Sequence, residues 1–132
     1  MTTKAQADWL ITAVAADLGL AVVKGTPAWD RPATAASAYV EWRQLEPLPA
    51  TRIGQTVTSA TTQFVVGARA TNEVELWALV DSMDAMIKSR TEATISGARY
   101  RVAWDAIRRM EQGDEVIEAL RYAALTICSM TR

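Results

Sequence analysis

The stretch RYRVAWDAIRRMEQGDEVIEALRYAAL, residues 99–125, decides the fold of this chain, because it suits either two helices or a β-hairpin. Its many Arg, Ala, Glu and Leu residues are good helix formers. Its first part nevertheless alternates, with Tyr100, Val102 and Trp104 on one side of a strand and arginines between them. The polar EQGD that follows, residues 111–114, has the composition of a hairpin turn.

The return arm, residues 115–130, is compatible with both structures. A helix would stack Val116 and Leu120 on one face, whereas a strand would place Leu125 and Ile127 on the same side. The strand is favoured because the preceding arm would otherwise be left with an unpaired edge. The sequence therefore predicts a hairpin, with the helix as the open alternative for this arm.

Two amphipathic helices are expected elsewhere. The first covers residues 3–18, where Thr3 and Gln6 form a capping box, a Leu10–Val14–Leu18 stripe follows, and Gly19 ends the helix. The second begins at an Asn72 cap with Glu75 in the capping-box position, carries two glutamates in its first turn, and has Lys88 and Arg90 at its end. Its apolar stripe comprises Leu76, Leu79, Val80, Met83, Met86 and Ile87.

The other segments predict strands separated by loops. Strands are expected over residues 20–25 and 37–47. The Thr- and Ser-rich stretch over 50–63 is expected to be a polar turn that leads into a strand, which the apolar run over 63–69 continues. A proline-containing loop separates the first two. The predicted fold is a single α+β domain over residues 1–132, with a mainly antiparallel sheet and two helices packed on one face.

Composition restricts the function. The chain has a formal net charge of −1 with 14 scattered basic residues, which argues against specific nucleic-acid binding. Its single cysteine, Cys128, is expected to be buried, and the acidic interruptions near the start argue against a signal peptide or membrane span. The absence of histidine removes the commonest general base and metal ligand. We expect an intracellular protein without a cofactor or metal.

Few residues suggest chemistry. Asp81 and Asp84 lie three apart on the second helix and could act as an acid–base pair or bind a metal, but a solvated face is the better interpretation. No glycine-rich phosphate loop or nucleophile elbow is present. Most of the five tryptophans are expected in the core; Trp29, held between prolines on a loop, is a candidate partner contact.

The order of these elements resembles a known family. A capped helix, a proline loop into AYVEW, a Thr-rich hairpin ending in FVVGARA, the helix NEVELWALVDSMDAMI, the strand GARYRV and the arm LRYAALTI follow one another. This order is similar to that of the tail terminator proteins of long-tailed bacteriophages, also called minor tail or tail-completion proteins. The resemblance covers nearly the whole chain and rests on patterns rather than on a catalytic signature.

The resemblance implies a structural role without enzymatic activity. Such proteins assemble as a homo-oligomeric ring, usually a hexamer, which caps the tail tube, stops its polymerisation and presents a surface to the head-completion protein. The protein would then belong to the virion tail and assemble in the bacterial host cytoplasm. A head-completion or connector ring of the phage neck is the first alternative, followed by a small cytosolic enzyme using carboxylates and a ligand-binding domain of a bacterial regulator.

Candidate interface residues follow from loops and sheet edges, which would supply a heterologous ring contact. The polar stretch over residues 45–62 is hypothesised to be ordered by neighbouring subunits or by the tube, so protease should cut it more slowly in the ring than in the free chain. The residues selected for subunit or partner contacts are Trp29, Arg31, Arg52, Thr56, Thr58, Arg99 and Arg101.

Overall fold

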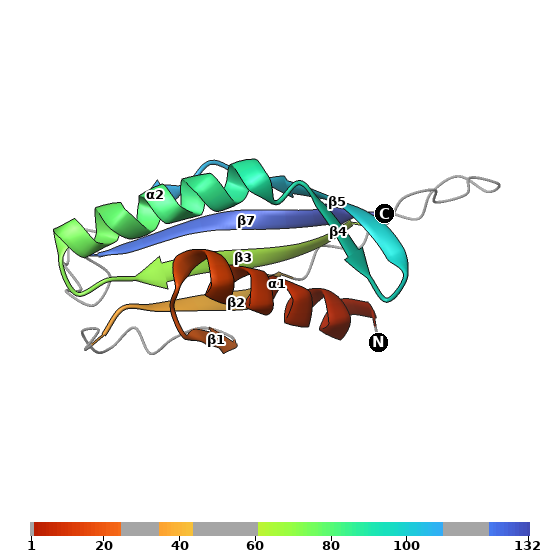
Figure 1. Cartoon of the computed structure of the whole chain (residues 1–132), viewed down its shortest axis with the longest axis horizontal. Coiled ribbons are helices and arrows are strands. Elements are labelled where there is room, and N and C mark those ends of the chain that lie inside the picture. The colour runs from red at the N-terminus through yellow and green to blue at the C-terminus, as the bar shows by residue number, and fades with distance from the viewer. Residues whose placement is uncertain (1, 25–34, 44–60, 110–121) are drawn as a thin grey trace.

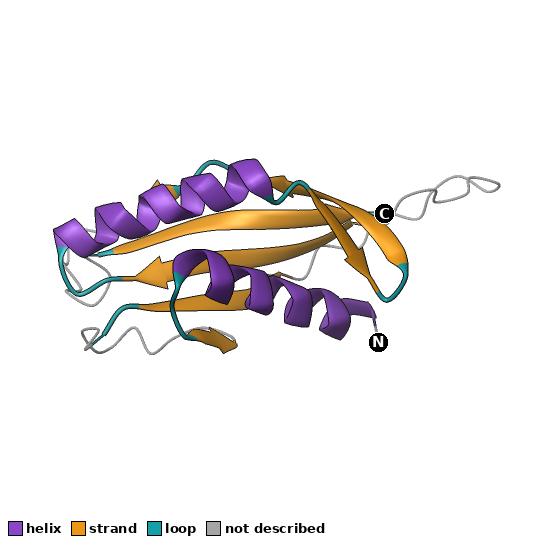
Figure 2. Ribbon diagram, in the orientation of Figure 1, coloured by secondary structure: helices purple, strands orange, loops and turns teal. Residues whose placement is uncertain are grey.

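The computed structural model describes residues 2–24, 35–43, 61–109 and 122–132, which form one seven-stranded sheet with two helices on the same face (Figures 1 and 2). This arrangement confirms the predicted α+β class with a mainly antiparallel sheet. The elements follow one another in the order α1 (Thr2–Leu18), β1 (Val22–Lys24), β2 (Ser37–Arg43), β3 (Thr61–Arg69), α2 (Glu73–Ser89), β4 (Glu92–Ile95), β5 (Ala98–Trp104), β6 (Arg108–Arg109) and β7 (Ala123–Thr131).

Strands β5 and β7 form the pair on which the fold prediction depended. They run antiparallel, with Arg101 opposite Thr131. Tyr100 and Val102 of β5 are buried, whereas Arg99 and Arg101 are exposed, which is the two-residue period expected of a half-buried strand. The strand interpretation is confirmed for the first arm and, in the return arm, for residues 123–130, where the helical alternative is wrong; the earlier part of the return arm lies outside the described residues.

Three of the predicted segments lie outside the described residues, wholly or in part. They are the proline-containing loop over 25–34, the polar stretch over 44–60, and the EQGD turn with the start of the return arm over 110–121.

The strand β7 lies inside the sheet, although it is the last strand along the chain. The order across the sheet is β1-β2-β3-β7-β5-β4, and β6 also pairs with β7. All pairs are antiparallel except β1 with β2. Two of these strands, β4 and β6, were not predicted from the sequence.

The short strand β6 continues the line of β5 along β7 after a bulge. Trp104 lies opposite Cys128, and Arg108 lies opposite Leu125. The three residues between Trp104 and Arg108 therefore face only the two residues of β7 that lie between Leu125 and Cys128. This extra residue defines a β-bulge over residues 105–107. The backbone N–H of the first bulge residue still donates a hydrogen bond of 2.9 Å to a carbonyl of β7.

The hairpin β4–β5 turns through Ser96 and Gly97. Their φ angles are +51° and +81°, both in the left-handed region that suits a two-residue hairpin turn. Ile95 and Ala98 pair directly across the turn. The turn therefore fixes the register of the whole hairpin.

The core lies between the two helices and one face of the sheet. The apolar stripes predicted for both helices are buried there, with the outermost positions of α2 partly covered. The largest side chains that are completely enclosed come from both helices, β3 and β7, and include Leu10, Val14, Phe64, Leu76, Met83 and Met130.

The predicted capping box of α1 is wrong. The helix begins at Thr2, so Thr3 lies inside it, and Gln6 is only 2% exposed. Gln6 precedes Leu10 by one turn on the buried stripe, and packing therefore turns its side chain inward. Its Oε1 accepts no hydrogen bond from the described part of the chain. Gly19, with φ of +65°, ends the helix as predicted.

The predicted cap of α2 is confirmed. Asn72 Oδ1 accepts a hydrogen bond of 2.9 Å from the backbone N–H of Glu75. The Glu75 carboxylate accepts a hydrogen bond of 2.9 Å from the backbone N–H of Thr71. In a standard capping box it would accept from the backbone N–H of the cap residue, Asn72.

On the helix-free face, Tyr39 of β2 lies across Gly67 of β3. The two residues are direct partners in the antiparallel register, and a Cβ on Gly67 would overlap the Tyr39 ring. The ring is 4% exposed, and its burial raises the pKa of Tyr39 to about 12. The glycine thus provides the space that the tyrosine occupies.

Candidate functional site

Of the seven residues predicted to contact subunits or partners, the structure describes Arg99 and Arg101. Both are exposed on β5, on the face opposite the helices. The remaining five lie outside the described residues: Trp29, Arg31, Arg52, Thr56 and Thr58.

The two described arginines belong to a basic surface at one end of the sheet. Glu92 lies opposite Arg101 and Thr94 opposite Arg99, and directly opposed residues of an antiparallel pair share a face. A hollow of about 350 Å³ lies here. Its lining comprises Glu92, Arg99, Tyr100, Arg101, Thr131 and Arg132. We call Arg99, Arg101 and Arg132 the arginine surface.

The arginine surface retains positive charge. Arg99 Nη2 lies 3.3 Å from Glu92 Oε2, with side chains 79% and 71% exposed, so water weakens this pair. Among the described residues, Arg101 and Arg132 have no ion-pair partner. Three arginines and one glutamate line this hollow, which suits the surface to an acidic partner.

A second hollow, of about 450 Å³, lies between α2 and the bulge that follows β5, and we call it the acidic groove. Apolar side chains and three carboxylates contribute to it together. Its lining comprises Val80, Asp81, Asp84, Ile87, Trp104, Asp105, Ala106 and Ile107.

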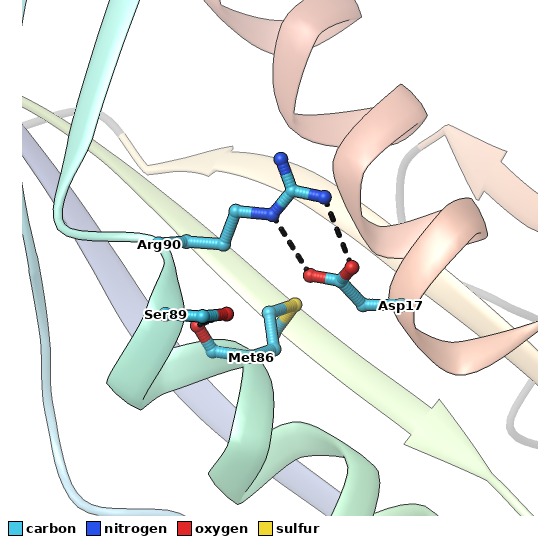
Figure 3. Close-up of polar contacts among 4 residues, drawn as sticks. All are labelled: Asp17, Met86, Ser89 and Arg90. Carbon is cyan, nitrogen blue, oxygen red and sulfur yellow. Dashed lines mark hydrogen bonds and ion pairs between the residues drawn. The ribbon is translucent and has the colours of Figure 1, made fainter.

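The walls of the acidic groove are held by hydrogen bonds to the backbone. Trp104 Nε1 donates to the carbonyl oxygen of Arg90 at 2.8 Å, which fixes the indole beside the end of α2. Thr126 Oγ1 donates to the carbonyl oxygen of Asp105 at 2.7 Å, which fixes the bulge against β7. Arg90 is itself fixed by a two-point contact with Asp17 (Figure 3). The groove is thus formed in the isolated chain.

The carboxylates on α2 lie on a solvated face, as the sequence predicted. Asp81 and Asp84 are both exposed, and Asp84 Oδ2 lies 2.8 Å from Lys88 Nζ one turn later. Within the described ranges, no cluster of three or more His, Cys, Asp or Glu side chains is arranged to hold a metal ion.

The sequence did not predict the acidic groove. The contribution of Asp105 depends on the bulge, which brings residues 105–107 to the groove beside α2, and no local pattern in the sequence marks a bulge. The two aspartates of α2 were identified as a pair, but their neighbours across the groove come from a distant strand.

The tryptophans are less buried than expected. Trp42 and Trp77 are 54% and 48% exposed, so the expectation of a core position is wrong for these two. Trp77 lies on the flank of α2, where the Arg109 guanidinium carbon lies 5.2 Å from its ring centroid and its Nε1 donates to Glu73 at 3.4 Å. A cation over one face and a hydrogen bond at the edge stabilise an indole at the surface.

The lone thiol is buried as predicted. Cys128 of β7 is 0% exposed, and burial raises its pKa to about 12. At neutral pH the side chain is therefore an inert, protonated core residue.

The sequence was compared with known proteins. No protein-family model matches it, and no curated protein matches it. In the described part of the chain, neither helix combines the length and the apolar character needed to cross a membrane.

Proposed function

We propose that this chain is a structural subunit of a phage tail that forms a ring, ends polymerisation of the tail tube and presents a surface for head attachment. The observation that carries the proposal is the single open sheet with both helices on one face and a different edge strand at each side, β1 and β4. The sequence resemblance to tail terminators rests on the order of helices and strands along the chain.

An open sheet of this kind suits a ring. A ring requires a heterologous contact, in which two different surfaces of the same subunit meet. The edge strands β1 and β4 run in the same direction, because β1 is parallel to β2 and four antiparallel pairings separate β2 from β4, but they differ in length and in side chains. The two edges are therefore different surfaces of one subunit, as a heterologous contact requires.

A connector ring of the neck would use the same features, so the experiment compares two partners. The purified chain is examined by sedimentation velocity and electron microscopy, then added to polymerising tail-tube protein and, separately, to head-completion protein. A tail terminator is expected to form an annulus about as wide as the tube and to shorten the tubes as its concentration rises.

The alternatives give different results. Annuli that bind head proteins and leave tube length unchanged would favour the neck connector. A chain that remains monomeric at all concentrations, alone and with tube protein, would overturn both assignments and leave the carboxylate enzyme or the regulator domain.

A further inference from the structure

We propose that the acidic groove of one subunit receives the arginine surface of the next, and that this contact builds the ring. The inference rests on the proposed function, since it names the surfaces through which copies of this chain would meet. The occupant of the groove is thus a second copy of the same chain.

The chemistry of the groove matches an arginine side chain. Arginine combines an apolar stem with a planar cation, and it buries the stem while its guanidinium binds carboxylates. The groove offers Val80, Ile87 and Trp104 as apolar wall, with Asp81 and Asp105 beside them. A small, wholly polar ligand would leave this wall uncovered.

The charges of the two surfaces are complementary, and two charged side chains of each surface form no ion pair within the described part of one copy. In the described residues neither Asp81 nor Asp105 forms a side-chain ion pair, and the same holds for Arg101 and Arg132. Bringing the two surfaces together would pair these groups and remove like-charge repulsion within each surface.

The two surfaces lie on different parts of one copy. The acidic groove lies beside α2 and the bulge after β5, whereas the arginine surface lies at the end of the sheet where β7 finishes (Figure 1). Two different patches that bind each other make a head-to-tail contact, which closes into a ring when the rotation allows it.

A charge-swap experiment tests this contact. Asp81→Lys replaces a carboxylate of the groove by a cation, and Arg101→Asp replaces a cation of the arginine surface by a carboxylate. We expect each variant alone to need about tenfold or more of the wild-type concentration for half-assembly, because like charges then meet. An equimolar mixture should regain assembly with the two variants alternating, and the double variant D81K/R101D should assemble alone.

Control variants change the charge at positions outside both surfaces. Ala78→Lys changes an exposed position of α2 outside the groove, and Arg43→Asp changes an exposed arginine on β2. Both should assemble as the wild type does, with circular dichroism showing that all variants are folded.

The outcomes separate this inference from the proposed function. If the wild type assembles and the two charge reversals assemble equally well, the contact is wrong and the ring stands. The contact is also wrong if the mixture and the double variant fail to regain assembly, or if Asp81→Lys abolishes only binding to tube or head protein. If the wild type forms no oligomer alone or on the tube, the proposed function itself is wrong.

Discussion

Asp17 and Arg90 join the C-terminal ends of the two helices through two parallel hydrogen bonds, each 2.9 Å long (Figure 3). The Asp17 carboxylate lies in the last turn of α1, where its negative charge is unfavourable because this end of the helix dipole is also negative. The positive charge of the Arg90 guanidinium compensates the carboxylate. The backbone of Arg90 serves two further contacts, since its N–H donates to Met86 and its carbonyl accepts from Trp104.

Removing this guanidinium should destabilise the fold. We expect Arg90→Ala to lower the free energy of unfolding by about 1–2 kcal/mol, a value reduced because the Arg90 and Asp17 side chains are 34% and 22% exposed. Urea denaturation measures the loss. Lys88→Ala, which removes a fully solvated pair with Asp84, is the matched control and should leave the free energy of unfolding almost unchanged. Equal effects of the two variants would contradict this role for Arg90.

The buried thiol predicts how stability depends on alkaline pH. Burial raises the pKa of Cys128 from 9.0 to about 12, so its stabilisation is complete below pH 9 and is lost as the pH rises toward 12. The free energy of unfolding should fall by up to about 1.4 kcal/mol per pH unit from this group. Urea titrations at pH 7, 9 and 10 measure the slope.

Two variants test whether Cys128 causes this dependence of stability on pH. Cys128→Ala should flatten the dependence between pH 9 and 10, although it lowers stability at pH 7 by about 1 kcal/mol through lost packing. Tyr39→Phe should leave this interval unchanged, because the pKa of Tyr39 is raised from 10.0 to about 12 and its effect begins above pH 10. Parallel profiles for the wild type and Cys128→Ala between pH 9 and 10 would show that another group titrates.

The turn of the β4–β5 hairpin can be improved. Ser96 adopts a positive φ, which asparagine tolerates better than serine does, and Asn-Gly is the preferred pair for this turn. Ser96→Asn should stabilise the protein by about 0.5 kcal/mol. Gly97→Ala should destabilise it by about 1 kcal/mol. Thermal unfolding measures both, and a destabilised Ser96→Asn would contradict the turn geometry.

The contact between Tyr39 and Gly67 predicts coupling between the two positions. Gly67→Ala introduces a methyl group where the ring lies, so we expect a loss of about 1–3 kcal/mol. In the Tyr39→Ala background the same change should be nearly neutral, because the space is then free. A double-mutant cycle measures the coupling, and additive losses would show that the ring is not what excludes the methyl group.

The sequence was informative where a pattern continues through an element. Alternation over Tyr100, Val102 and Trp104 predicted β5, and Asn72 with the leucine stripe after it predicted α2, because local preference and packing agree there. The short strands β4 and β6 carry little apolar repetition. β6 is a pair of arginines whose conformation is set by pairing with β7 rather than by its own preference.

The candidate surfaces were predictable only in part. Arg99 and Arg101 were selected as exposed positions on a strand, and they are exposed. The acidic groove joins a helix to a bulge from another part of the chain, so it depends on register, which single residues do not reveal. Gln6 shows the opposite error: its type suggested a cap, but the buried stripe of α1 determined its orientation.

The interior position of β7 has a consequence for synthesis. Its partners β3 and β5 flank it on both sides, and Thr61 pairs with Thr131 across 70 residues. While the chain is being translated, β3 and β5 therefore emerge with their inner edges unsatisfied, and they stay so until the segment up to residue 131 has left the ribosome. Nascent chains stalled before β7 should consequently depend on chaperones and be sensitive to proteases, whereas chains in which β7 has emerged can pair both of these edges.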